Sequence, residues 1–211
     1  MIGFKKRFSP TYRFLKNLFQ EEIGKPKWIF IKFALGKVES QWFWNEGDGG
    51  GPIVENTIHM IDLLHYLVGK VDRVYGEGGT LFRKEKSPQI DGAIFTLRLE
   101  NGAVAGIGAG YASEWEIATE EVDFANEISV GKVEGTFDYP FELFYIYRQN
   151  PNQIYKKFFP MPDGFKEEIE HFINCIIKGE TPEATGEDGL EALKVALAVK
   201  KSITTDKPVI L

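Results

Sequence analysis

The sequence contains one cysteine and no long apolar run, and each shortage excludes a class of protein. Cys175 has no partner for an internal disulfide, which favours a reducing compartment. It lies in the apolar stretch 172–177 and is typical of a buried small hydrophobic residue. No stretch of about 18 apolar residues is present to cross a membrane. The N-terminus also lacks the apolar core of a secretory signal. We therefore expect a cytoplasmic protein.

Positive charge is in deficit, and the loops that hold nucleotides are missing. The 25 lysines and arginines against 31 aspartates and glutamates give a formal net charge of -6. No basic stripe collects phosphate contacts, so we expect no nucleic-acid partner. The sequence has no Walker A motif and no G-x-G-x-x-G turn after an N-terminal strand. The glycines within 106–110 have a different spacing and fall in a predicted strand, where they permit close packing. We therefore predict no cofactor-binding residues within this chain.

The pattern that is present predicts a long run of strands with helices at its ends. Strands are predicted at 28–35, 71–82, 92–99, 103–110, 122–130, 132–139 and 208–211. Asn101-Gly102 and Gly131 predict tight turns between them. A helix is predicted from Pro52 to Val68, ended by Gly69. Consecutive strands joined by short turns indicate an α+β fold, with a large, mostly antiparallel sheet and helices on one face.

Two helices near the C-terminus each have an apolar face. The first face consists of Phe165, Ile169, Phe172, Ile173, Ile176 and Ile177, and the second of Leu190, Leu193, Ala196, Leu197 and Ile203. The predicted sheet is also rich in aromatic residues, namely Phe95, Phe124, Phe137, Tyr139, Phe141 and Phe144. These aromatic side chains either fill the core or form an outward apolar patch that needs a partner.

The first residues predict a structural unit without neighbours. Residues 2–4 are apolar like the end of a buried strand, and Ser9-Pro10 then predicts the start of a helix. A buried parallel strand needs a strand on each side. We therefore expect residues 1–24 to be the last strand and helix of an absent dinucleotide-binding (Rossmann) domain. Residues 25–211 would then form a substrate-binding and oligomerisation domain.

The helix after the glycines carries the clearest chemistry. Glu55, His59, Asp62 and Tyr66 form a polar stripe at i, i+4, i+7 and i+11. A solvated face would explain a polar stripe, but this one has no lysine or arginine and begins after three glycines, where backbone can approach a ligand. A carboxylate one turn before a histidine can orient the imidazole and raise its pKa. We therefore predict that Glu55 and His59 are catalytic.

A metal site is the competing hypothesis for the same stripe. Glu55, His59 and Asp62 supply three ligand types from one helix. Metalloprotease helices place histidine at both i and i+4, whereas only one of those positions is histidine here. We therefore favour proton handling and expect no metal.

The stretch 49–64 resembles the signature helix of the glucose–fructose oxidoreductase and inositol dehydrogenase (Gfo/Idh/MocA) family. Residues 2–12, 23–26 and 171–190 are similar to further segments of that family, in the same order. The resemblance implies the fold of the C-terminal domain of dihydrodipicolinate-reductase-like dehydrogenases, with an open sheet face that forms a homo-oligomer. It implies hydride transfer between NAD or NADP and a sugar, polyol or related small molecule. It places His59 where the proton is exchanged, and Glu55 where the family usually has aspartate.

The glycine-rich turn of that family and its Glu-Lys-Pro motif have no counterpart in this chain. We expect an oxidoreductase domain that is inactive without a separate Rossmann-domain partner, from a split enzyme or a fragment. The alternative is a reduced descendant that binds a small molecule or assembles without catalysing. Arg7, Trp44 and Asp62 are the candidate substrate-binding residues. Surface charge would equally explain Arg7, and core packing Trp44.

Overall fold

The computed structural model describes residues 1–211 except 37, 87, 114–118, 137–140, 148–152 and 160–163. In the described part, one sheet has the strand order β8-β7-β6-β5-β1-β4-β3-β2-β9. The strands are β1 (Trp28–Gly36), β2 (Val71–Gly79), β3 (Gly92–Leu99), β4 (Val104–Ser113), β5 (Thr119–Ala125), β6 (Ser129–Thr136), β7 (Phe141–Tyr147), β8 (Gln153–Phe159) and β9 (Val209–Ile210). The helices are η1 (Lys5–Phe8), α1 (Pro10–Glu21), α2 (Gln41–Trp44), η2 (Ile53–Thr57), α3 (Ile58–Leu67), η3 (Lys84–Lys86), α4 (Gly164–Lys178) and α5 (Gly186–Thr205).

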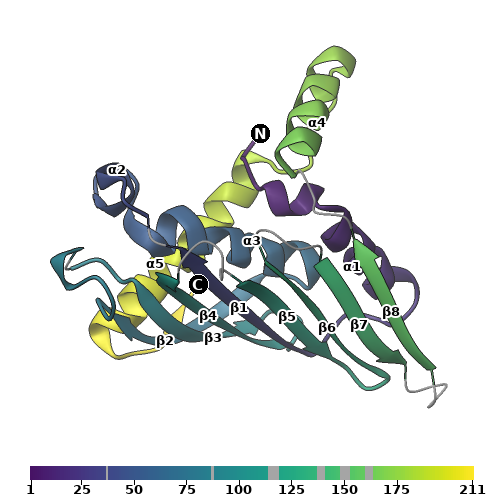
Figure 1. Ribbon diagram of the computed structural model, residues 1–211, viewed down its shortest axis with the longest axis horizontal. Coiled ribbons are helices and arrows are strands. Elements are labelled where there is room, and N and C mark those ends of the chain that lie inside the picture. Colours follow the sequence, from purple (N-terminus) through teal and green to yellow (C-terminus); the bar gives the residue numbers. More distant parts are fainter. Residues whose placement is uncertain (37, 87, 114–118, 137–140, 148–152, 160–163) are drawn as a thin grey trace.

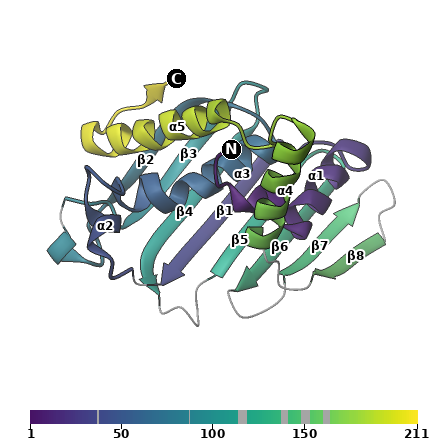
Figure 2. The ribbon, with the colours of Figure 1, turned by 90° about the horizontal axis from the view of Figure 1, so that it is seen from above.

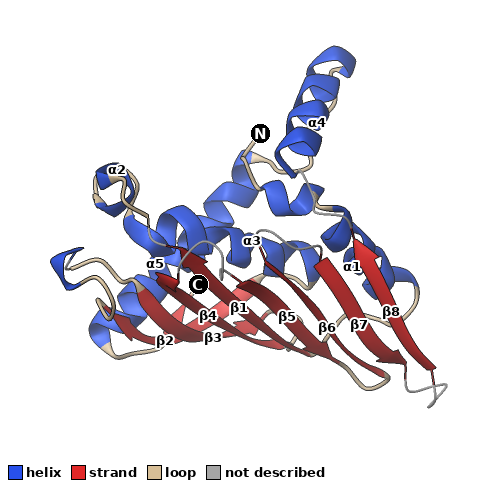
Figure 3. Ribbon diagram, viewed as in Figure 1, coloured by secondary structure: helices blue, strands red, loops and turns tan. Residues whose placement is uncertain are grey.

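The helices lie on one face of the sheet and leave the other face open (Figures 1 and 3). All neighbouring strands described are antiparallel except β1 and β4, which run parallel with Trp28 opposite Val104. The α+β prediction is therefore confirmed. The position of β1 at the centre was not predicted, because strand propensity carries no information on partner order.

Close packing at the β4 glycines is also confirmed. A Cβ atom on Gly106 would lie 2.7 Å from the ring of Phe30 on the neighbouring strand. The glycine therefore leaves room for the ring of Phe30 against β4. This stretch is a strand within the sheet, not a loop that could hold a pyrophosphate.

The helices lie over one face of the sheet (Figure 2), and the hydrophobic core is formed by residues of both layers. Burial alternates along β3, with Ala93, Phe95 and Leu97 inward. Leu15 of α1 and Leu64 of α3 belong to the same hydrophobic cluster as these strand residues. The N-terminal segment therefore packs into the same core as the sheet.

Two local predictions are wrong. Residues 1–4 form no strand, and a short 3-10 helix follows them. Gly131 is not a turn but lies inside β6, opposite Phe124. The turn falls at Asn126, whose Oδ1 accepts hydrogen bonds from the backbone N–H groups of Ile128 and Ser129 at 3.0 and 2.9 Å. The turn is thus formed by an asparagine whose side chain accepts hydrogen bonds from the following backbone, and not by the glycine at which turn propensity predicted it.

The C-terminal helices bury less of their apolar faces than amphipathic helices usually do. All six apolar residues of the predicted α4 face are exposed, between 42% and 76%. On α5 the buried residues are smaller, among them Ala192, Val195 and Val199, while Leu190 and Leu197 are exposed. Cys175 is buried as predicted.

Of the aromatic residues in the predicted sheet, Phe95 and Phe124 are buried in the core. Phe137 and Tyr139 lie outside the described residues, as do the side chains of Phe141 and Phe144. Within the described part of the chain, no helix is both long and apolar enough to span a membrane.

Candidate active site

The glycines at the start of the site are required by backbone conformation and by a neighbouring side chain. Gly50 and Gly51 have φ angles of +75° and +80°, in the region that favours glycine. A Cβ atom on Gly51 would lie 2.0 Å from Oε1 of Gln89. The close approach that the glycines permit is therefore to Gln89 of this chain.

The helix that carries Glu55 and His59 begins with a π turn. The π segment η2 runs into α3 without a break. Tyr111 of β4 supports it from the core: its hydroxyl donates to the carbonyl of Pro52 at 2.9 Å and lies 3.0 Å from Thr57 Oγ1. Burial raises the pKa of Tyr111, so its hydroxyl keeps the proton that it donates. Such wide turns often occur at functional sites.

His59 is partly buried and lies close to the segment Phe4–Lys6. Its ring meets Phe4 edge-on at 5.8 Å between centroids. Nδ1 is buried and has no hydrogen-bond partner among the described residues. Burial and the positive charges of Lys6 and Lys5 lower the pKa of His59 to about 4. The imidazole is therefore neutral at pH 7 and its ring can accept a proton.

Glu55 lies half-buried on the preceding turn. Burial raises its pKa, and the charge of Lys5 opposes that rise. Across the described ranges no hydrogen bond or ion pair joins Glu55 to His59, and the pKa of His59 is lowered rather than raised. The structure therefore places both predicted residues near Lys5 without showing the orienting contact. Their catalytic role stays a prediction.

Arg7 and Asp62 form a buried ion pair. Nε of Arg7 lies 3.1 and 3.0 Å from the two Asp62 oxygens, and Nη2 lies 2.6 Å from Oδ1. Arg7 is 6% exposed and Asp62 is fully buried. The guanidinium also donates to the carbonyl of Glu183 at 2.8 Å and lies 3.2 Å from Asp188. The pair thus fixes η1 to α3 and to the start of α5.

The electrostatics of this pair favour the charged form of Arg7. Burial alone would lower the pKa of Arg7, but hydrogen bonds and charges from Asp62 and Asp188 raise it. Burial raises the pKa of Asp62, and the hydrogen bonds from Arg7 oppose that rise. The interaction between Arg7 and Asp62 therefore offsets the free-energy cost of burying each charge.

Trp44 is buried, and its hydrogen-bond and ring partners are Val38, Phe43, Arg83 and Lys86 rather than His59. Its indole Nε1 donates to the carbonyl of Val38 at 2.7 Å, and its ring contacts Phe43 at 5.1 Å between centroids. In the part of the chain that the structure describes, no three His, Cys, Asp or Glu side chains are grouped to hold a metal ion.

Comparison with known proteins gives the family. A model described as the C-terminal alpha/beta domain of an oxidoreductase family (Gfo/Idh/MocA) matches residues 16–211. The chain belongs to this family.

Two curated relatives and one solved structure illustrate the likeness. Myo-inositol 2-dehydrogenase of Thermotoga maritima is 27% identical over 98% of this chain and 63% of its own length. The NAD(+)-dependent scyllo-inositol 2-dehydrogenase of Bacillus subtilis is 26% identical over 99% of this chain and 61% of its own. The fold matches that of aldose-aldose oxidoreductase from Caulobacter crescentus, complexed with glycerol, with a TM-score of 0.83 at 20% identity over 100% of this chain and 64% of that one. This chain therefore spans less than two thirds of these relatives.

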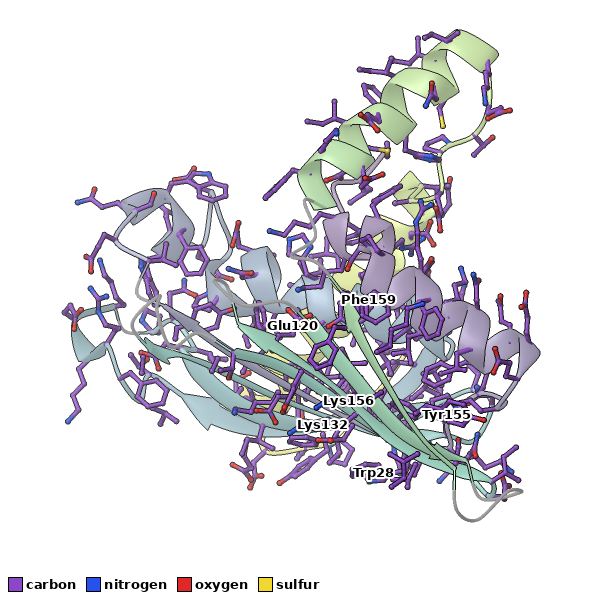
Figure 4. All side chains as sticks on the ribbon, turned by 45° about the vertical axis from the view of Figure 1, so that its right-hand side comes forward. Trp28, Glu120, Lys132, Tyr155, Lys156 and Phe159 are labelled. Carbon is purple, nitrogen blue, oxygen red and sulfur yellow. The ribbon has the colours of Figure 1, made fainter. Side chains whose placement is uncertain are left out.

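In this Gfo/Idh/MocA domain, one cluster near His59 was not predicted. Glu120 of β5 is buried and accepts hydrogen bonds from Lys6 and from the Tyr12 hydroxyl. Figure 4 shows Glu120 on the helix side of the sheet and Trp28 on the open side. Lys6 lies within the predicted N-terminal unit, residues 1–24, and 114 residues separate it from Glu120. No spacing rule could have joined them.

The partly buried histidines of α3 predict a loss of stability in acid. Burial, before any charge effect, lowers the pKa of both His59 and His65 to about 4. Between about pH 6.5 and 4 the unfolded chain therefore binds more protons than the native one, so the free energy of unfolding falls as pH falls through this window. The loss is at most about 3 kcal/mol for each histidine. Urea unfolding at several pH values measures it.

The matched control is His65→Gln, which removes one of the two titrating groups. Its unfolding free energy should depend less steeply on pH than that of the parent between pH 6.5 and 4. Identical pH dependence in parent and variant would contradict the assignment to buried neutral histidine.

Proposed function

We propose that this chain is the substrate-side domain of a nicotinamide-dependent oxidoreductase that acts on a sugar or polyol. The observation that carries the proposal is His59, on the helix that follows the glycines and near Lys5 and Lys6. It is neutral at pH 7, and its buried Nδ1 has no hydrogen-bond partner among the described residues. The family membership and the names of the inositol dehydrogenases support the substrate class.

His59 would exchange the proton of the reacting hydroxyl. A neutral imidazole accepts that proton when the alcohol is oxidised and returns it when the carbonyl is reduced. Lys5 and Lys6 supply positive charge nearby, which favours the negative charge that develops on the substrate oxygen. Glu55 would bind a second hydroxyl of the substrate, since it does not contact His59.

Arg7, Asp62 and Trp44 would act as positioning residues. The polar groups of Arg7 and Asp62 are used within the buried ion pair, and that pair holds the Phe4–Lys6 segment against the His59 helix. Trp44 contacts Val38 and Phe43 and so stabilises the segment that precedes the glycines. We therefore assign substrate contact to His59, Glu55 and Lys5 instead, since Lys6 is paired with Glu120.

We expect no site for a nicotinamide dinucleotide among the described residues of this chain. A dinucleotide usually binds at a glycine-rich turn between a strand and a helix, whereas the glycines of β4 lie within a strand and Gly106 is packed against the ring of Phe30. NAD or NADP, which would supply the hydride acceptor, is therefore expected on a separate Rossmann domain. Without such a domain the chain would be inactive.

The test is a chimera in which the preceding, unmatched part of the Bacillus scyllo-inositol 2-dehydrogenase is joined ahead of Met1. We expect the chimera, but not the chain alone, to reduce NAD+ with scyllo- or myo-inositol. Turnover by the chain alone would refute the dependence on a second domain. Calorimetric binding of inositol by a folded chimera without turnover would favour the alternative of a non-catalytic binding module.

The open face of the sheet is proposed as a homo-oligomer interface. Trp28, Ile94, Val104 and Phe158 point to this face and are between 45% and 66% exposed. A charge placed among them would have to be buried in the assembly, so Ile94→Glu should convert the oligomer to monomers. Sedimentation at micromolar concentration measures the mass.

The control for that variant is Leu197→Glu, which adds the same charge at an exposed apolar position on α5. The control should keep the mass of the parent. A parent chain that is strictly monomeric would refute the interface.

A further inference from the structure

Glu120 of β5 joins the sheet to the start of the chain through a buried polar cluster. Its carboxylate accepts one hydrogen bond from the Lys6 ammonium and one from the Tyr12 hydroxyl. The side chain of Glu120 is 9% exposed and that of Lys6 is 13% exposed. Burial removes part of the hydration of both charges, so each depends on the geometry of the pair.

Two neighbouring strands fix the position of the Lys6 ammonium. Phe33 of β1 lies directly opposite Glu120 of β5 in the antiparallel register, and opposite residues of paired strands point to the same face of a sheet. The Lys6 ammonium lies 5.4 Å from the centroid of the Phe33 ring. It is therefore held by a carboxylate and by the face of an aromatic ring at once. Figure 4 shows Glu120 on the helix side of the sheet.

The carboxylate of Glu120 is itself oriented from the core. Tyr12 of α1 is buried, and its hydroxyl donates to Oε1 of Glu120 while Lys6 donates to Oε2. Burial raises the pKa of Tyr12, so the hydroxyl keeps the proton that it donates. Because both oxygens bind donors from different elements, the Lys6 ammonium is held against a fixed acceptor.

Lys6 acts in turn on His59. It lies two residues after Phe4, whose ring meets that of His59 edge-on. After burial, the positive charge of Lys6 is the largest influence that lowers the pKa of His59, and Lys5 follows. Among the described residues, the charge of Glu120 acts on Lys5 but is not one of those that act on His59. The Lys6–Glu120 pair therefore presents its positive end to the imidazole.

The other charged side chains near this segment are engaged elsewhere. They belong to the buried ion pair of η1 and α3 or surround Lys5, and they are Arg7, Asp62, Glu55 and Glu168. Burial and the charge of Lys6 lower the pKa of Lys5, and the surrounding carboxylates oppose this. Lys6 is therefore the cation near His59 whose position depends on Glu120.

We propose that Glu120 is a positioning residue that holds the ammonium of Lys6 beside His59, so that the imidazole stays neutral and ready to accept the substrate proton, an inference that rests on the proposed function. Lysine carries its charge on a flexible stem and loses it readily when it is buried without a partner. Without the charge of Glu120, the ammonium of Lys6 turns out to solvent or gives up its proton. Both events remove the positive charge from His59.

A purely structural ion pair is the competing interpretation. Such a pair would fix η1 to β5 and contribute to stability, but it would leave the protonation of His59 unchanged. Stability measurements alone cannot distinguish the two roles, because the loss of Glu120 destabilises the chain in both. The titration of His59 distinguishes them.

NMR titration of the imidazoles in the chain alone tests the proposal. The chain has three histidines, and His59→Gln assigns the signals of His59. We expect Lys6→Met to raise the pKa of His59 from about 4 to about 4.5 or higher, because a neighbouring charge commonly shifts a pKa by about one unit. Glu120→Gln should raise it by a similar amount. The double variant should raise it no further than Lys6→Met, because both changes act through one ammonium.

Two controls separate this effect from a general change in the fold. His65 lies on the same helix and burial likewise lowers its pKa to about 4, but Lys6 is not among its charged neighbours. The titration of His65 should therefore stay the same in every variant. Glu121→Gln removes the next carboxylate of β5, which pairs with Lys32 at 2.7 Å, and should leave the pKa of His59 unchanged.

An unchanged or lowered pKa of His59 in Glu120→Gln would overturn the proposal, because Lys6 would then keep its charge and its place without Glu120. Equal shifts at His59 and His65 would assign the pair a structural role and overturn it as well. Glu120→Asp replaces Glu120→Gln if the latter does not fold. It keeps the charge but shortens the reach by one methylene, so it should raise the pKa of His59 by less than Lys6→Met does, and the absence of any rise would count against the proposal.

The pH dependence of the chimera separates this role from the proposed function. If His59 accepts the substrate proton, the acid limb of kcat/KM follows the pKa of His59 and moves to higher pH in Glu120→Gln. A raised pKa of His59 with an unmoved acid limb would count against the proposed function and preserve the hold of Glu120 on Lys6. An acid limb that follows His59 in Lys6→Met but does not move in Glu120→Gln would preserve the function and refute the positioning role.

Discussion

Replacing His59 with alanine is expected to slow the chimeric enzyme by about two to four orders of magnitude, the usual contribution of a positioned acid–base group. The same change should alter the melting temperature of the chain little. Nδ1 has no partner to lose among the described residues, and the ring makes one edge contact, with Phe4. Steady-state turnover of the chimera and thermal unfolding of the chain are measured together.

His65→Ala is the matched control for this prediction. His65 lies on the same helix, and burial lowers its pKa to about 4 as it does for His59. Its electrostatic neighbours are Glu191, Arg7, Lys70 and Asp188, toward α5, rather than the lysines of η1. Turnover of His65→Ala should stay near that of the parent. If His59→Ala melts far earlier yet keeps its turnover when folded, His59 is a structural residue.

The elements that the sequence predicted best are those set by local residues. Periodicity gave β3 at its observed ends, and Asn101-Gly102 gave the turn after it, where Gly102 has a φ of +85°. The pairing of strands far apart in the chain depends on how whole faces of the sheet are buried. The central position of β1 therefore could not be predicted from the sequence. Residues 2–4 were apolar enough for a strand, but a strand exists only where a neighbour supplies backbone hydrogen bonds.

The site was predicted in residue type more than in contact. The helix and its polar stripe followed from spacing, but the π turn depends on Tyr111, which comes from β4 and reaches Pro52 and Thr57 across the core. Likewise Arg7 and Asp62 were each singled out, yet nothing in the spacing indicated that they bind each other. Contacts between residues so far apart in the chain depend on the packing of η1, α3 and the sheet, which only the folded structure defines.

The exposed apolar face of α4 shows that sequence analysis can predict a helix without predicting what the helix packs against. An amphipathic pattern predicts that an apolar face will be covered, but not what covers it. Among the described residues the sheet does not cover this face, and on the other side of α4 His171 accepts a hydrogen bond from the backbone N–H of Glu183. The pattern was therefore right about the helix and incomplete about its partner.

Replacing Arg7 with alanine is expected to lower the free energy of unfolding by about 3–5 kcal/mol, because it leaves a buried charge without its partner. Asp62 is fully buried, and in the described structure only Arg7 donates to its carboxylate. Asp62→Asn should cost less, since Arg7 still contacts Asp188 and the Glu183 carbonyl. Urea unfolding of both variants at pH 7 makes the comparison.

Arg13→Ala is the matched control for Arg7→Ala, since Arg13 makes its ion pair with Glu183 at the surface, at 3.0 Å and with 46% of its side chain exposed. Its loss should cost about 1 kcal/mol or less. The deficit of Arg7→Ala should also shrink as the pH falls. In the variant the hydrogen bonds from Arg7 no longer oppose the effect of burial, so the pKa of Asp62 in the native state rises further. As the pH falls, the native variant binds a proton at Asp62 before the unfolded chain does, and this stabilises the native variant. A deficit that is equal for Arg7→Ala and Arg13→Ala, or that does not change with pH, would mean that the Arg7–Asp62 pair does not act as a buried charge pair.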